Sequence, residues 1–367
     1  MLDGLTFGWR TAILLVAVGQ LLLIAAALSR TLHNRSANRT LALLLVVLSG
    51  ILTPWMIGFA GFYDRWRWLT FAPFAITLAV APLLYLYVEA LVAGRWPVRA
   101  WRHLVAPSVQ LAFLTTGFLL PWPLKDAWAD ASYREYEGLT GALCIAGLAS
   151  YGIVGLRRLA AYRALLAAQR SDDHRFAARW LSRAITAALA LCAVWGTYLL
   201  WDAVAPLGYV GLMGLYIAIA AFGLYLGIEG WRHAERPFPP MATLAIAPEP
   251  ATRDWRRIGE GWAVRVRSEG WSAEPELSLP VVARRLGTNT AHLSRALNEG
   301  LGVNFSTFVN GLRCDTVAAA LDAGSDANLL TLALDAGFGS KASFNRAFQA
   351  AYGVAPSDYR RRVLKSK

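Results

Sequence analysis

Seven long stretches without a charged side chain lie within the first 229 residues, and they constrain the fold more than any other feature. These stretches are residues 11–29, 40–63, 68–88, 104–124, 138–156, 184–201 and 203–228. A helix needs about 17–25 mostly apolar residues to cross a bilayer. We therefore expect an all-α chain that begins with a bundle of seven transmembrane helices. No comparable stretch follows Glu229.

The overall composition agrees with a membrane protein. Hydrophobic residues make up 56% of the 367 residues and charged residues only 16%, whereas soluble domains carry about 25% charged residues. This balance excludes a disordered chain and a wholly soluble one. Three cysteines are too few for a disulfide framework.

Lysine and arginine are distributed unequally between the two sets of alternate connections, which predicts the orientation. The connections after the first, third and fifth stretches hold 13 basic residues, and the N-terminal segment with the other connections holds 5. Basic loops favour the cytoplasmic side. We therefore expect a multi-pass protein of the bacterial inner membrane, with its N-terminus outside and its C-terminal part in the cytoplasm.

A proline-rich segment separates the apolar part from the rest of the chain. Five of the sixteen prolines lie within residues 237–250. Such a segment cannot form a long helix and is semi-rigid where prolines cluster. The sequence thus predicts three parts: a membrane domain over 1–229, a linker over 230–252 and a soluble domain over 253–367.

The soluble domain shows the spacing of two helix-turn-helix units. Short amphipathic helices are predicted over 277–286 and 290–299, joined by a turn at Gly287, and again over 329–336 and 341–351, joined by a turn at Gly337. A longer helix over 305–321 connects the two units. The second helix of such a unit can enter the major groove of DNA, so the pair predicts a DNA-binding domain.

The residues of the second unit also carry a family resemblance. The pattern consists of Ala333, Gly337, Phe338, Ser340, Phe344, Arg346, Phe348, Gly353, Pro356, Tyr359 and Arg360. Residues 255–362 resemble the DNA-binding domain of the AraC/XylS family of transcription activators. A seven-span segment ahead of such a domain resembles the membrane-anchored branch of that family, on architecture rather than motif.

The resemblance implies which side chains face DNA. In the first unit these are Asn289, Thr290, Ala291, Ser294, Arg295 and Asn298, and in the second unit Ser340, Lys341, Ala342, Asn345 and Arg346. Arginine can bind guanine and asparagine can bind adenine through paired hydrogen bonds. The alternative for Arg295 and Arg346 is an ion pair within the domain or a solvated charge.

The sequence predicts neither an enzyme nor a metal or cofactor site, because no set of nucleophile, base and acid has a useful spacing. The acidic residues Glu89, Asp202 and Glu229 lie at the ends of apolar stretches, where water or headgroups can solvate them. We expect a one-component transcriptional regulator that binds promoter DNA and lipid and senses an unknown signal ligand. RNA polymerase is a partner implied by the family, and a homodimer is one route to coupling. The alternative is a membrane transporter or receptor with a regulatory DNA-binding tail.

Overall fold

The computed structural model describes residues 5–170, 176–205, 207–244 and 254–365. These residues form helices and no β-strand, which confirms the predicted all-α class. The chain divides into two compact units. Residues 1–159 and 178–240 make up the apolar unit, and residues 160–177 and 241–367 make up the C-terminal unit.

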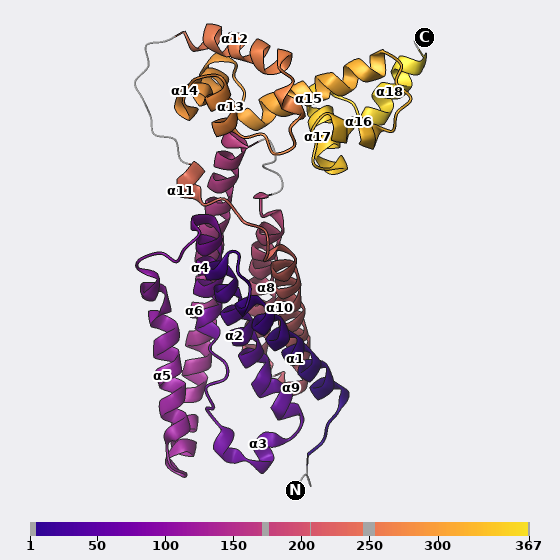
Figure 1. The fold of residues 1–367 in the computed structure, drawn as a ribbon. Helices are drawn as coiled ribbons and strands as arrows, with labels where there is room; N and C mark the ends of the chain where they lie inside the picture. The colour runs from indigo at the N-terminus through magenta and orange to yellow at the C-terminus, as the bar shows by residue number, and fades with distance from the viewer. Residues whose placement is uncertain (1–4, 171–175, 206, 245–253, 366–367) are drawn as a thin grey trace. The chain divides into compact units, whose positions relative to one another are not determined.

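The apolar unit is built mainly from long helices (Figure 1). In chain order the elements from the N-terminus to the linker are α1 (Trp9–Ser29), α2 (Arg35–Phe59), α3 (Phe62–Arg65), η1 (Arg67–Leu69), η2 (Thr77–Ala79), α4 (Val80–Ala93), η3 (Ala100–Leu104), α5 (Val105–Leu119), α6 (Leu124–Gln169), α8 (Arg179–Val204), α9 (Gly208–Gly211), α10 (Met213–His233) and α11 (Met241–Leu244). The end of α6 and all of α11 fall within the C-terminal unit.

The prediction of seven membrane-spanning helices is wrong for the described residues. Five helices are long and apolar enough to cross a membrane: Trp9–Ser29, Arg35–Phe59, Glu135–Gln169, Arg179–Trp201 and Met213–His233. The other two apolar stretches form the shorter helices α4 and α5, of 14 and 15 residues.

Prolines explain why these two stretches do not form full-length helices. Proline lacks an amide proton and clashes with the preceding turn, so it suits the first turn of a helix and not the interior. Pro82 lies in the first turn of α4, and Pro107 lies in the first turn of α5. Pro73 falls in non-helical chain, whereas α2 continues through Pro54. An apolar stretch therefore did not guarantee an unbroken helix.

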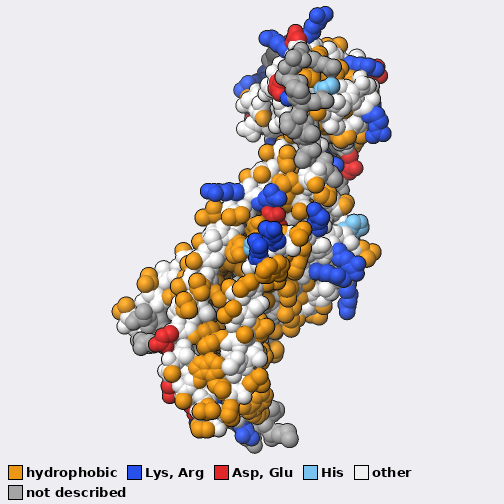
Figure 2. Space-filling model, turned by 90° about the vertical axis from the view of Figure 1, so that its left-hand side faces the viewer, with side chains coloured by type: hydrophobic (Ala, Val, Ile, Leu, Met, Phe, Trp, Pro, Cys, Tyr) orange, Lys and Arg blue, Asp and Glu red, His pale blue; other side chains and the backbone are white. Residues whose placement is uncertain are grey.

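Glycines on one face of α10 let it pack closely against α1 and α2. A Cβ atom at Gly223 would lie 3.2 Å from the Leu21 side chain, and one at Gly227 would lie 3.2 Å from Leu45. At Gly230 a Cβ would overlap the side chain of Leu41. Small residues at such spacing allow helices to approach closely in membranes, where no hydrophobic effect drives them together. In Figure 2, apolar side chains cover much of the visible face of the apolar unit.

The C-terminal unit consists of short helices around one longer helix. They are α12 (Trp255–Ser268), η4 (Trp271–Ala273), α13 (Leu279–Arg285), α14 (Thr290–Arg295), the π-turn η5 (Ala296–Gly300), α15 (Phe305–Asp322), α16 (Leu329–Asp335), α17 (Lys341–Tyr352) and α18 (Pro356–Lys365). The two helix-turn-helix units and their connecting helix α15 lie where the sequence predicts them.

Helix α15 contributes to two separate cores. Its first half supplies Phe305 and Val309 to the core of the first unit, and its second half supplies Val317 and Leu321 to the core of the second. All four side chains are at most 3% exposed. Each helix-turn-helix unit therefore has its own apolar cluster on a shared helix.

The predicted linker over 230–252 begins later than expected, because α10 continues to His233. Residues 241–244 form the single turn α11. The rest of the predicted linker, residues 245–252, lies outside the described residues.

Candidate functional site

The turn of the first helix-turn-helix unit is set by local chemistry. Gly287 has a φ of +71°, a left-handed conformation that costs glycine little. The side-chain oxygen of Asn289 then accepts a hydrogen bond from the amide of His292 at 2.8 Å. This cap satisfies an amide that the first turn of a helix leaves free, so α14 begins at Thr290.

The second unit uses the same devices. Gly337 has a φ of +96°, and the hydroxyl of Ser340 accepts a hydrogen bond from the amide of Ser343 at 3.3 Å. Phe344 and Phe348 lie on the inner face of α17 and are 1% and 0% exposed. The sequence pattern thus fixes which face of α17 remains outside.

Four of the five predicted DNA-facing residues of the second unit are exposed. They are Lys341, Ala342, Asn345 and Arg346, whereas Ser340 is partly buried by its capping role. Lys341, Asn345 and Arg346 together form a polar exposed face of α17, which we call the α17 face. Among the described residues, Arg346 forms no ion pair within the domain.

The first unit presents a less basic surface. Asn289 and Asn298 are exposed, and Thr290, Ala291 and Ser294 are partly exposed. Asn298 donates a side-chain hydrogen bond to the hydroxyl of Ser294 at 3.1 Å. These side chains are short and uncharged.

Arg295, which the resemblance predicts to face DNA, is only partly exposed. Its side chain is 21% exposed, and its Nε lies 3.4 Å from Oε1 of Glu299. Its guanidinium lies 5.9 Å from the ring centroid of Trp255 on α12. The structure therefore favours the alternative of an ion pair within the domain.

Two tyrosine–aspartate pairs join helices of the C-terminal unit. Neither pair was predicted from the sequence. Tyr352 donates a hydrogen bond to Asp315 at 3.0 Å, and Tyr359 donates to Asp322 at 3.1 Å. Burial, with the neighbouring carboxylates, raises the pKa of both phenols. These bonds attach α17 and α18 to α15. Tyr359, which belongs to the sequence pattern of the second unit, thus has a structural role here.

Comparison with known proteins agrees with this geometry. A family model described as a helix-turn-helix domain matches residues 282–362. The C-terminal unit contains a helix-turn-helix domain of the AraC type. Such domains bind double-stranded DNA, which agrees with the predicted DNA-binding role of this unit.

Individual relatives match over the same short length. An HTH-type transcriptional regulator of Staphylococcus aureus strain MSSA476 is 35% identical over 85 residues, which are 23% of this chain and 11% of the relative. Another from Staphylococcus aureus is 37% identical over 85 residues. The chain thus spans about a tenth of the length of these curated relatives. The C-terminal domain of AraT, a response regulator from Geobacillus stearothermophilus, is similar at 24% identity over 31% of this chain and 88% of that one, with a TM-score of 0.25.

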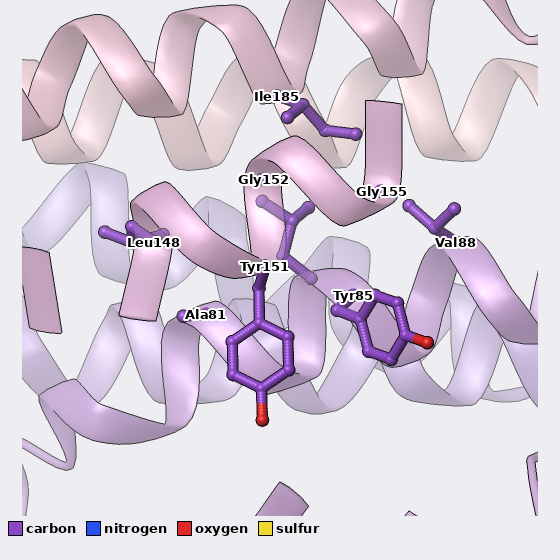
Figure 3. Close-up of a pocket in the computed structure, with 9 residues that line it drawn as sticks. Ala81, Tyr85, Val88, Leu148, Tyr151, Gly152, Gly155 and Ile185 are labelled. Atoms are coloured by element: carbon purple, nitrogen blue, oxygen red, sulfur yellow. The ribbon is translucent and has the colours of Figure 1, made fainter. Parts of the chain in front are cut away.

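The apolar unit holds a small hollow between α4, α6 and α8 (Figure 3). Tyr85, Tyr151 and Gly152 are among its lining residues. The ring of His103 lies beside both tyrosines, and its Nδ1 is 2.9 Å from the hydroxyl of Tyr151. Polar groups therefore gather at the edge of this hollow.

Glu89 is buried rather than solvated as predicted. It is 8% exposed, and its Oε1 lies 2.9 Å from Nε of Arg158. Glu229 is paired with Arg232 at 2.8 Å. The side chain of Asp202, the third predicted acid, lies outside the described residues. Among the described residues, no group of three or more His, Cys, Asp or Glu side chains could hold a metal ion.

Proposed function

We propose that this protein is a membrane-embedded, one-component transcriptional regulator whose C-terminal unit binds promoter DNA and whose apolar unit senses a signal. The observation that carries the proposal is the joining, in one chain, of an AraC-type helix-turn-helix domain and five apolar helices of membrane-spanning length. Promoter DNA, membrane lipid and RNA polymerase are the proposed partners, together with an unidentified signal ligand and a second copy of the chain.

In this proposal, the α17 face carries most of the base discrimination. Arg346 can form a bidentate contact with guanine, and Asn345 can form one with adenine. Lys341, next to the helix N-terminus, suits a phosphate. With Arg295 held against α12, α14 contributes the smaller polar side chains Asn289, Thr290, Ser294 and Asn298. The first unit then mainly orients the domain on the duplex and contributes little to the recognition of guanine.

The proposed topology rests on the charge asymmetry between alternate connections. Five crossings, like seven, put the two ends of the apolar unit on opposite sides of the membrane. The basic connection at residues 157–183 is proposed to lie in the cytoplasm. Residues 95–102 lie between the shorter helices α4 and α5, so their proposed cytoplasmic placement requires that these two helices carry the chain to that side and back. The C-terminal unit then faces the nucleoid of a bacterial cell, while the N-terminus lies outside.

Contacts at the end of α10 support coupling between the two parts of the chain. Asn34, the N-cap of α2, and Asn38, in the first turn of α2, donate side-chain hydrogen bonds to the Ala234 carbonyl at 3.2 and 3.1 Å. The Asn34 side-chain oxygen also accepts from the amide of Phe238 at 3.3 Å. We call Asn34, Asn38, Ala234 and Phe238 the exit clamp.

The exit clamp fixes the start of the chain that leads to the DNA-binding domain. Phe238 is 6% exposed and Ala234 is 2% exposed, so both are buried in the apolar unit. A signal that favours one arrangement of α1, α2 and α10 would therefore move this segment. A ligand shifts such an equilibrium only through different affinities for the two arrangements.

A selection experiment tests the proposed function. The full chain in lipid nanodiscs is mixed with a library of random DNA duplexes, and bound duplexes are amplified over several rounds. We expect a defined sequence to be enriched by the wild type, and Arg346→Ala to lose the preference for guanine at one position of that sequence. If the duplexes recovered with the wild type remained as random as the starting library, the proposal would be contradicted.

A further inference from the structure

Arg313 is a buried arginine on the connecting helix α15. It is 2% exposed and is the largest fully buried side chain of the described residues. A buried guanidinium is costly unless its donors find acceptors. The partners of Arg313 therefore indicate what its position achieves.

Arg313 binds the backbone that leads into the first helix-turn-helix unit. Its Nε donates to the carbonyl of Ser272 at 2.7 Å, and one terminal nitrogen donates to the carbonyl of Glu274 at 2.6 Å. The other terminal nitrogen donates to Oδ1 of Asn310 at 3.2 Å. Two charge-assisted bonds thus attach α15 to residues 272–274, which precede α13.

The turn of the second unit meets the same segment. The guanidinium of Arg313 lies 5.7 Å from the ring centroid of Phe338. A Cβ atom at Gly337 would lie only 2.5 Å from the carbonyl oxygen of Ala273 and 2.8 Å from that of Ser272. Arg313, the segment 272–274 and the turn 337–338 therefore converge at one junction.

We propose that Arg313 is a positioning residue that sets the separation and rotation of α14 relative to α17. The inference rests on the proposed function, in which both helices bind one duplex. Two recognition helices serve one duplex only if they match successive faces of the major groove, about 34 Å apart. Arg313 fixes that match because its bonds join the connecting helix to the entrance of one unit while its face packs on the turn of the other.

Arg313 belongs to neither apolar core, so its positioning role is distinct from a role in core packing. The core of the first unit and that of the second are distinct clusters. Replacing Arg313 removes its hydrogen bonds to the carbonyls of Ser272 and Glu274 and so loosens the junction, while the apolar residues of both clusters remain. Each recognition helix then keeps its own surface, and the loss falls on their joint action.

The test compares DNA probes that do or do not require both helices. The probes are the duplex selected by the wild-type chain, the same duplex with one recognised segment scrambled, and a series in which one to five base pairs are inserted between the segments. Arg313→Lys and Arg313→Gln are assayed as full chains in nanodiscs. The matched control is Arg267→Gln, because Arg267 is exposed and pairs with Asp315 at 3.3 Å.

We expect Arg313→Gln to bind the two-segment duplex about ten-fold or more weakly, because the second contact loses its effective concentration. Its affinity for the scrambled duplex should change by less than about three-fold, and its preference for the original spacing should flatten. Arg313→Lys, which keeps the charge without the fork, should show the same pattern to a smaller degree. Arg267→Gln should behave as the wild type.

Several outcomes would overturn the inference. They are an equal loss on both duplexes, unchanged spacing dependence in both variants, and a wild type that is insensitive to inserted base pairs. If both variants unfold, as monitored by labelling of the buried Cys314 thiol, Arg313 is a folding residue and the inference also fails. A wild-type chain that selects no sequence would instead defeat the proposed function.

Discussion

Arg295 lies against Trp255, with its guanidinium 5.9 Å from the centroid of the indole ring. The arginine of α14 is thereby turned toward α12, while Arg346 of α17 remains exposed. Two arginines at matching places in a repeated motif thus have different surroundings. This difference predicts that the two units contribute unequally to DNA binding.

Replacement of the two arginines should separate their roles. Arg346→Ala should weaken binding to the selected duplex by about 1–3 kcal/mol, with the loss confined to duplexes that carry guanine at one position. Arg295→Ala should affect binding less than Arg346→Ala, because its side chain already binds Glu299 and Trp255. Titrations with duplexes substituted at each position measure both. An equal loss for Arg346→Ala on every duplex would make it a phosphate contact instead.

Lys341 should behave as a phosphate contact. Lys341→Ala is expected to weaken binding to all duplexes alike and to reduce the slope of log affinity against log salt by about 1. Titrations over a series of salt concentrations measure this slope. Retention of the full slope together with a base-dependent loss would place Lys341 at a base edge.

The turn of the second unit offers a matched pair of glycine variants. Gly337→Ala should destabilise the C-terminal unit by at least about 1–2 kcal/mol, because it combines a φ of +96° with a Cβ 2.5 Å from the Ala273 carbonyl. Gly339→Ala is the control, since a Cβ there meets no atom within 4 Å. Labelling of Cys314 in a Cys144→Ala, Cys192→Ala background measures opening of this unit. Similar labelling rates for the two glycine variants would contradict the packing described.

Stability of the C-terminal unit should fall at alkaline pH. Burial, with Asp315, raises the pKa of the Cys314 thiol from 9.0 to about 12. Between these values the unfolded chain loses a proton that the folded chain keeps, so the folded state is progressively disfavoured as the pH rises. Denaturant unfolding from pH 8 to 10.5 measures this decline, which should be shallower in Cys314→Ala. Equal slopes for the variant and the wild type would show that this thiol does not contribute.

Disruption of the exit clamp should loosen the start of the linker. Asn38→Ala removes a hydrogen bond to the Ala234 carbonyl, which is worth about 0.5–1.5 kcal/mol. Hydrogen exchange of residues 234–240 should therefore quicken several-fold. His33→Ala is the control, because the ion pair of His33 with Glu235 is exposed and contributes little. Faster exchange in the control than in Asn38→Ala would contradict the role assigned to the clamp.

The proposed orientation predicts the results of reporter fusions. Fusions within residues 95–102 and 157–183 should be active with a cytoplasmic reporter and silent with a periplasmic one, because these connections carry the excess of arginine. A fusion at the N-terminus should show the reverse. Periplasmic activity at either connection would overturn the topology.

Local signals explain which features the sequence predicted correctly. The helices of the C-terminal unit begin at caps such as Asn289 and Ser340 and follow glycines at turns such as Gly287 and Gly337. These devices act over a few residues, so a short stretch of sequence is enough to recognise them. The same holds for the inward face of α17, where Phe344 and Phe348 are four residues apart.

Features that depend on distant neighbours were not predicted. The orientation of Arg295 depends on Trp255, 40 positions earlier in the sequence. The role of Arg313 depends on backbone carbonyls about 40 residues away. In the apolar unit, α2 tolerates Pro54 whereas the chain at Pro73 is not helical, and apolar composition alone does not distinguish the two.

The most direct test of a membrane-anchored DNA-binding protein is made in intact cells. Cells that express the wild type or Arg346→Ala are crosslinked, the membrane fraction is isolated, and the DNA bound to the protein is sequenced. The account predicts that a small set of discrete chromosomal sites is enriched with the wild type in the membrane fraction and lost in the variant. Uniform recovery of the genome with the wild type, or recovery of the protein outside the membrane fraction, would contradict it.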